Sequence, residues 1–261
     1  MTIRFFLRDY FFKMWYWYVN RIDKNAEILF MNYGYYDKDQ HDIEEAHDNQ
    51  NRYSIQLYHH LASAAEIKNK DVVEIGCGRG GGLAYIFSHF SAKSAHGIDL
   101  NKQAITFCKS HHKENGLTFM QGNAQNLKLG DNTTDIVINV ESSHRYPNMK
   151  MFLSEVYRIL RPGGYFLLTD FRYDYDMEKT KKDLDSCGLT LIKQKIINKE
   201  VIAALDLEDS RKRVLIKRLA PKFLYTLAHN FAATIGSQTY NSFVSNKYVY
   251  FSYVFIKPLS S

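Results

Sequence analysis

The sequence predicts an α/β protein in which helices cover both faces of a parallel sheet. From residue 71 onward, short apolar runs alternate with helical patterns, and strand–helix–strand units of this length are typical of parallel sheets. The first of these runs ends in a cluster of glycines, as expected for a buried strand followed by a sharp turn. The chain has 261 residues and is 45% hydrophobic, so it can bury an extensive core.

Each element of this fold has its own signal along the chain. Apolar runs predict core strands at 71–75, 95–100, 117–124, 134–142 and 165–171, followed by 189–197 and 247–258. Helices are expected after Gly80, after Asn101 as the N-cap residue, and around 152–160. The last of these helices should stop at Arg161-Pro162-Gly163-Gly164, which is a strong helix breaker.

Two further segments flank this core. Residues 1–65 precede the first core strand and have a mainly helical pattern. Residues from about 198 to 246 form a mostly helical insertion that is too long for a simple connection. We interpret both segments as lids over a single domain, residues 66–261, and not as separate domains.

Charge and cysteine content exclude several classes of protein. Lys and Arg number 34 and Asp and Glu 28, and this net charge of +6 is too small for a dedicated nucleic-acid binder. Cys77, Cys108 and Cys187 are widely spaced and form no C-x-x-C, which argues against a zinc site or disulfide framework and favours a reducing, cytoplasmic location. No metal is predicted, because HDIEEAH (residues 41–47) lacks the H-E-x-x-H spacing.

Two segments suggest contact with a membrane surface, although no run of about 18 apolar residues predicts a spanning helix. Residues 1–20 are rich in aromatic and basic side chains, and residues 211–222 begin with the basic run RKRVLIKR, which has an apolar side. Both patterns suit a helix that lies on anionic lipid. The alternative for residues 1–20 is a cap packed on the protein. The alternative for the basic run is a solvated helix face.

The strongest motif is VEIGCGRGGG, residues 73–82. Alternate glycines at Gly76, Gly78 and Gly80 let the chain turn sharply from strand to helix and let a ligand approach the main chain. A G-x-G-x-x-G pattern through Gly76, Gly78 and Gly81 keeps nicotinamide or flavin binding open. The motif lacks the Lys-Ser/Thr ending of a phosphate-binding P-loop, which argues against a nucleoside triphosphate.

Three further residues distinguish between the cofactors. Glu74, inside the turn, would repel a pyrophosphate but suits a cationic ligand. Asp99 ends the second strand, where a carboxylate can hold ribose hydroxyls. Asn123 follows the third strand and can contact an adenine edge. S-adenosylmethionine, which joins an adenosine to a positively charged, amine-bearing tail, fits all three.

These motifs resemble those of class I S-adenosylmethionine-dependent methyltransferases over residues 71–171. The resemblance implies a Rossmann-like, doubly wound, seven-stranded sheet whose last strand is antiparallel. Most family members carry Asp at the position of Asn123, although an Asn carbonyl can also accept a hydrogen bond from the adenine amino group. The resemblance further implies that Glu74, Gly76, Cys77 and Gly78 hold the methionine part, Asp99 and Leu100 the ribose, and Asn123 and Ala124 the adenine.

A narrower resemblance rests on NYGYY (residues 32–36), NVESSHRYPN (139–148) and LLTDFR (167–172). These segments are similar to the mycobacterial phthiotriol/phenolphthiotriol dimycocerosate methyltransferases and, more distantly, to methyltransferases of sterols, tocopherols and macrolides. The narrower resemblance implies that the acceptor is a hydroxyl on a long lipid, that Tyr33 closes over the cofactor and that Asn139 contacts it.

The end of the fourth strand carries the expected chemistry. Ligands in open α/β sheets bind beyond the carboxyl ends of the strands, which places Glu141 and His144 near the transferred methyl group. An alcohol acceptor must lose its proton, and His144 is the predicted base because imidazole titrates near neutral pH. Glu141 either binds the acceptor or holds backbone amides, and Tyr146 is expected to pack against the substrate.

The sequence thus predicts an S-adenosylmethionine-dependent enzyme that methylates a hydroxyl of a lipid or hydrophobic natural product. The alternatives are C-methylation of a sterol, quinone or tocopherol-like ring, and N-methylation. A non-catalytic binding module and a nicotinamide oxidoreductase are the rival classes.

Overall fold

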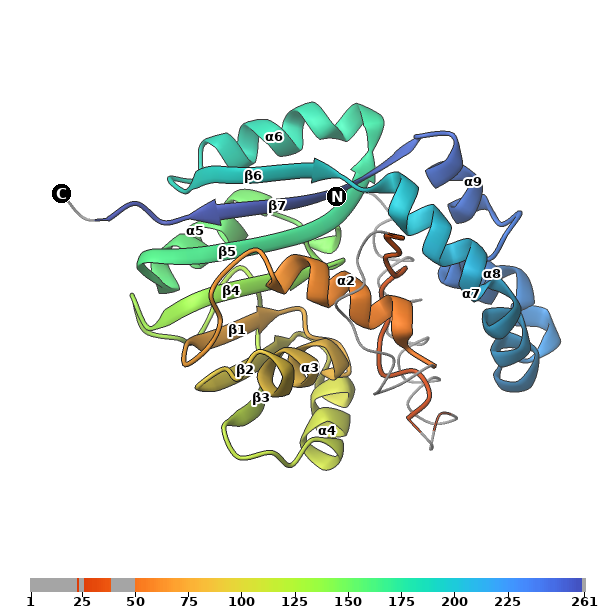
Figure 1. The fold of residues 1–261 in the computed structure, drawn as a ribbon, viewed down its shortest axis with the longest axis horizontal. Coiled ribbons are helices and arrows are strands. Elements are labelled where there is room, and N and C mark those ends of the chain that lie inside the picture. The colour runs from red at the N-terminus through yellow and green to blue at the C-terminus, as the bar shows by residue number, and fades with distance from the viewer. Residues whose placement is uncertain (1–22, 24–25, 39–49, 260–261) are drawn as a thin grey trace.

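Seven strands form one sheet in the order β3-β2-β1-β4-β5-β7-β6 in a computed structural model, which describes residues 23, 26–38 and 50–259 (Figure 1). Neighbouring strands from β3 to β5 are parallel, whereas β7 is antiparallel to both β5 and β6. This topology confirms the predicted doubly wound fold with an antiparallel last strand. The strands are β1 Asp71–Ile75, β2 Ser94–Asp99, β3 Leu117–Gln121, β4 Thr134–Val140, β5 Leu160–Tyr173, β6 Thr190–Ile196 and β7 Tyr248–Ile256.

Successive residues of each buried strand point to opposite sides of the sheet, so both faces are apolar. Helices cover both of them. Val72 of β1 packs in one hydrophobic cluster together with residues of α2 (Arg52–Ala62), α3 (Gly81–His89) and α4 (Lys102–His111). Its neighbour Val73 packs in a second cluster with α5 (Met149–Ile159) and α6 (Met177–Asp185). The Asn101 side chain accepts hydrogen bonds from two backbone N–H groups at the start of α4, which confirms the predicted N-cap.

The glycine-proline breaker lies inside a strand and not in a loop. Helix α5 ends at Ile159, and β5 begins directly at Leu160, whereas the sequence predicted a strand from residue 165. Strand β5 starts before residue 165 because the backbone of Lys257 pairs with it. The Lys257 carbonyl accepts from Gly163 N–H (2.8 Å), and the Lys257 N–H donates to the Gly164 carbonyl (2.9 Å).

The mainly helical pattern expected for residues 1–65 is wrong for residues 26–38, which form no helix, whereas residues 52–62 form helix α2. The segment of residues 26–38 turns at Gly34, whose φ is +90° and whose N–H donates to the Asn32 side chain (2.9 Å). Its backbone is paired with distant elements, since the N–H of Tyr35 donates to the Tyr53 carbonyl (2.9 Å). In Figure 1 this segment runs between the carboxyl ends of the parallel strands and the helices of residues 198–246.

The helices between β6 and β7 are α7 (Asn198–Leu219), α8 (Tyr225–Ala232) and α9 (Gln238–Val244). On the surface of this region, Val214 is 66% and Phe223 is 84% exposed. Membrane contact through residues 211–222 stays a prediction, and residues 1–20 lie outside the described residues. None of the described helices is long and apolar enough to cross a membrane.

Candidate active site

The glycine turn connects β1 to α3 with a backbone that requires glycine. Gly76 (φ +81°), Gly78 (φ +53°) and Gly80 (φ +79°) all adopt left-handed conformations. The N–H of Gly76 donates to the Ile98 carbonyl (2.7 Å), which fixes the turn beside the end of β2. A Cβ atom on Gly76 would lie 1.9 Å from Ser142 Oγ, so the loop after β4 packs directly against the turn.

Replacing Gly76 with alanine is expected to destabilise the protein by about 2–5 kcal/mol, because it combines left-handed strain with a steric clash. Gly236→Ala is the matched control: Gly236 has a φ of +82°, and an added Cβ would meet nothing within 4 Å. It should therefore cost only the backbone strain, about 1–2 kcal/mol. Urea unfolding measures both changes, and equal losses would show that contact with Ser142 does not constrain the turn.

Glu74 places a buried carboxyl group beside this turn. Its Oε1 accepts a hydrogen bond from the Tyr58 hydroxyl (2.7 Å), whereas its Oε2 has no hydrogen-bond partner among the described residues. Burial raises the pKa of Glu74 to about 8. A buried carboxylate oxygen without a partner is costly, and a cationic ligand would relieve that cost. The site therefore fits the amino group of the predicted S-adenosylmethionine.

Binding of S-adenosylhomocysteine at pH 7 is expected to release about one proton from Glu74, because a raised pKa keeps the carboxyl protonated until a cationic amino group favours its ionised form. Calorimetry in buffers of different ionisation enthalpy measures this release. Glu74→Gln should abolish the release and weaken binding. A proton count that is unchanged in that variant would assign the titration to another group.

The predicted adenosine contacts meet at one edge of the sheet. Asp99 Oδ2 accepts from Gly78 N–H (2.9 Å), and the Asp99 carbonyl accepts from Gly122 N–H (3.0 Å), which places Asn123 nearby. Leu100 is 62% exposed at this edge, where an adenosine could cover it. The Asn123 side chain accepts from Gln125 N–H (3.0 Å) and so also holds its own loop. The neighbouring Ala124 is buried in the core.

Asn139 and Tyr146 form hydrogen bonds that hold the loop after β4 against the end of β1. Asn139 Nδ2 donates to the Ile75 carbonyl (2.7 Å) and to the Tyr146 hydroxyl (3.1 Å), and Ser142 Oγ lies 2.7 Å from the same hydroxyl. Neither Asn139 nor Tyr146 lines the cavity described below. The sequence predicted a cofactor contact for Asn139 and a substrate contact for Tyr146, and both contacts stay predictions beside these hydrogen bonds to the loop.

His144 is oriented by Asp170, a residue that the sequence reasoning missed. Asp170 ends the buried part of β5, next to β4, and its Oδ1 lies 2.7 Å from His144 Nδ1. Its Oδ2 accepts from Ser143 Oγ (2.6 Å) and His144 N–H (2.9 Å) and pairs with Arg172 (3.0 Å). Burial opposes ionisation of Asp170, but its pairing with His144 and Arg172 outweighs burial and lowers the Asp170 pKa.

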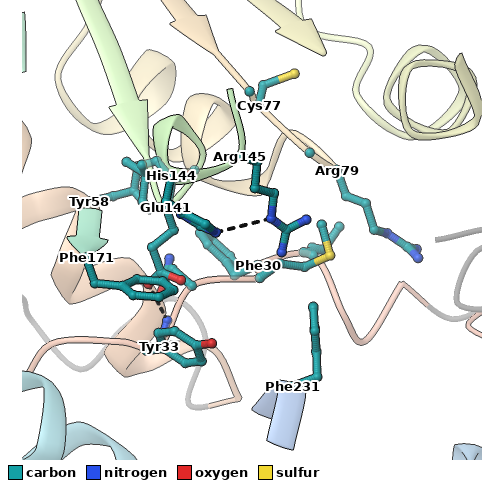
Figure 2. A pocket seen from close by; sticks show the side chains of 17 residues that line it. Phe30, Tyr33, Tyr58, Cys77, Arg79, Glu141, His144, Arg145, Phe171 and Phe231 are labelled. Carbon is teal, nitrogen blue, oxygen red and sulfur yellow. Dashed lines mark hydrogen bonds between the residues drawn. The ribbon is translucent and has the colours of Figure 1, made fainter. Parts of the chain in front are cut away.

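These contacts define the state of the His144 imidazole. Burial lowers the pKa of His144 despite the attraction of Asp170, so the ring is neutral at pH 7. With Nδ1 donating to the Asp170 carboxylate, the lone pair is on Nε2. This Nε2 accepts a hydrogen bond from Arg145 Nε (3.2 Å), and Figure 2 shows the Arg145 guanidinium extending from His144 into the cavity. Sequence reasoning gave Arg145 no role.

Glu141 connects the segment of residues 26–38 to the sheet. Its Oε1 accepts from the backbone N–H of Tyr33 (2.7 Å) and from the Tyr250 hydroxyl (2.5 Å). Burial raises the pKa of Glu141 to about 8. Of the two predicted roles, acceptor binding and holding a backbone amide, the structure contains the second. The Tyr33 ring packs on Phe171, with ring centroids 5.6 Å apart.

Two adjoining cavities lie at the carboxyl end of the sheet. The first spans about 650 Å³, including space open to solvent, and brings together Tyr33, Gly76, Cys77, Gly78, Glu141 and His144 from the predicted set (Figure 2). The second spans about 870 Å³, including space open to solvent, and lies between residues 27–33 and helices α7 and α8. Residues 30–33 and Phe231 line both cavities. In the described part of the chain, no cluster of His, Cys, Asp and Glu could hold a metal ion.

Comparisons with known proteins agree with this geometry. A family model described as a methyltransferase domain matches residues 73–168. The fatty-acid O-methyltransferase of Mycolicibacterium smegmatis is 39% identical over 94% of this chain and 89% of its own length. The phthiotriol/phenolphthiotriol dimycocerosates methyltransferase of Mycobacterium tuberculosis is 37% identical over 94% of this chain and 92% of its own.

Solved structures share the fold at lower sequence identity. A putative sarcosine dimethylglycine methyltransferase from Galdieria sulphuraria has a TM-score of 0.69 at 16% identity and covers 87% of this chain and 93% of its own. A geranyl diphosphate methyltransferase in complex with GPP and sinefungin has a TM-score of 0.65 at 14% identity, covering 87% and 89%.

Proposed function

This chain belongs to the S-adenosylmethionine-dependent methyltransferases and uses that cofactor, and we propose that it transfers the methyl group to an oxygen atom of a lipid acceptor. The observation that best supports this proposal is the pair of adjoining cavities. One contains the glycine turn and His144, and the other is lined largely by apolar side chains of α7, α8 and residues 28–33. The names of the two curated relatives, which refer to fatty-acid and phthiotriol substrates, support a lipid acceptor.

The main task of the protein is to position the acceptor. When bound, S-adenosylmethionine supplies a methyl group that its sulfonium already activates. Bringing the acceptor oxygen within about 3–3.5 Å of that methyl group supplies most of the acceleration. Tyr33, Phe171 and Phe231 line the first cavity, called the cofactor cavity below, where their rings would limit the access of water to the bound reactants.

The acceptor oxygen can be a hydroxyl, as the sequence predicted, or a carboxylate. A hydroxyl would give its proton to Nε2 of His144, which Asp170 orients through Nδ1. Arg145 must first turn away from Nε2, because its Nε–H occupies the lone pair. A carboxylate is already ionised and needs no base.

A panel of acceptors tests the proposal. Labelled S-adenosylmethionine is incubated with a long-chain alcohol, the acid and the amine of the same chain length, and a sterol. We expect label on the alcohol, as a methyl ether, or on the acid, as a methyl ester. Label on the amine or the sterol alone, or on no acceptor, would contradict O-methylation of a lipid.

A further inference from the structure

The second cavity, called the apolar cavity below, is lined by Lys212, a cation without a counter-ion among the described residues. Lys212 of α7 lines the cavity on the same helix face as Leu215, Ile216 and Leu219. No residue in the described part of the chain forms a hydrogen bond or an ion pair with its ammonium group.

The acidic groups around Lys212 are bound to other partners. On α7, Glu208 pairs with Arg211 (2.9 Å to Nε) and Asp209 with Arg213 (2.6 Å to Nε). On the facing β4 loop, Glu141 Oε1 already accepts from a backbone amide and the Tyr250 hydroxyl. Burial lowers the pKa of Lys212 to about 8, which is still high enough to keep it predominantly cationic at pH 7.

The position of Lys212 is close to the boundary between the two cavities. Lys212 lines the apolar cavity and Glu141 lines the cofactor cavity, and the two cavities share residues 30–33 and Phe231 in their walls. Tyr33 lies in the shared wall and donates its backbone N–H to Glu141. An anion bound to Lys212 would therefore lie where a lipid head group meets the methyl donor.

We propose that Lys212 binds the carboxylate of a long-chain fatty acid, whose alkyl chain occupies the apolar cavity. This inference rests on the proposed function and names its acceptor class. An ammonium group without a counter-ion in an apolar wall gains most from an anion, whereas an alcohol would leave the charge uncompensated. Lys212 is a positioning and specificity-determining residue in this scheme, and His144 has no proton to remove.

Methyl transfer to a carboxylate needs no base. A carboxylate oxygen forms a bond to the methyl carbon as the carbon–sulfur bond breaks, and the bonding electron pair stays on sulfur. The negative charge of the carboxylate and the positive charge of the sulfonium disappear together, and no proton is released. The methyl ester is neutral, so Lys212 no longer holds it and the product can leave.

Direct binding to the complex with S-adenosylhomocysteine tests the inference. The probes are palmitic acid and the alcohol of the same chain length, titrated into wild type, Lys212→Met and Lys212→Arg at pH 7. Lys217→Met is the matched control, because Lys217 is exposed on the same helix. Lys212→Met should weaken binding of the acid by at least about tenfold and of the alcohol by less than about twofold. Lys212→Arg and Lys217→Met should bind the acid like wild type.

Thermal unfolding separates this effect from misfolding. Lys212→Met should melt at the same temperature as wild type or higher, because it removes a half-buried cation without a counter-ion. Equal weakening for acid and alcohol, or no weakening for either, would overturn the role of Lys212. If the acid binds as expected but yields no methyl ester, the proposed function fails while the binding role of Lys212 stands.

Discussion

Asp170→Ala is expected to destabilise the protein by about 3–5 kcal/mol, because it leaves a buried cation without its partner. Asp170 is fully buried and pairs with Arg172, which is itself only 11% exposed. It also accepts hydrogen bonds from Ser143 Oγ and from the backbone N–H groups of His144 and Phe171. Removing the carboxylate therefore leaves several buried donors unsatisfied as well as one unpaired charge. Thermal or urea unfolding measures the loss.

Asp131→Ala is the matched control for this change. Asp131 also pairs with an arginine, Arg158, at 2.7 Å, but its side chain is 68% exposed. Water screens such a pair, so the control should lose less than about 1 kcal/mol. Asp170→Asn keeps the shape of the side chain and should fall between the two. A loss for Asp170→Ala no greater than for Asp131→Ala would contradict the account of this buried network.

His144→Ala is expected to lower kcat on a hydroxyl acceptor by about 10²–10⁴-fold, the usual contribution of a general base. Asp170 holds the neutral imidazole with its Nε2 lone pair toward the cavity, which is the state that can take a proton. On a carboxylate acceptor, the same variant should lose much less, because no proton is transferred. Steady-state kinetics with the alcohol and the acid of equal chain length compare the two effects.

His111→Ala serves as the control, since His111 is an exposed residue on α4. It should leave both reactions unchanged. Full retention of hydroxyl methylation in His144→Ala would defeat the role of His144 as a base. Equal large losses on both acceptors would instead show that His144 mainly holds Arg145 in place.

The sequence was sufficient for features that depend on local patterns. Alternating apolar runs predicted the strands, and Asn101 was predicted as the N-cap of α4. The alternate glycines of residues 76–80 predicted a sharp turn from strand to helix, and the structure has this turn, with left-handed backbone at Gly76 and Gly78. Such features involve neighbouring residues only, so a single sequence contains them.

Features that depend on contacts between residues far apart in the chain were not predicted from the sequence. Asp170 meets His144 because β4 and β5 are neighbours whose carboxyl ends lie at one edge, and the DFR in residues 170–172 could have suggested this. Tyr58 on α2 reaches Glu74 without any local signal. The apolar cavity is built from residues 27–33, α7 and α8, which are far apart in the chain. Residues 26–38 are not helical because their backbone pairs with such distant elements.

A crystal structure with S-adenosylhomocysteine and a long-chain acid tests the central claim most directly. The cofactor amino group is expected within hydrogen-bonding distance of Glu74 Oε2. The alkyl chain is expected in the cavity lined by α7 and α8, and the acceptor oxygen beside His144, facing the cofactor sulfur. A lipid bound outside that cavity, or a cofactor that makes no contact with Glu74, would contradict the claim.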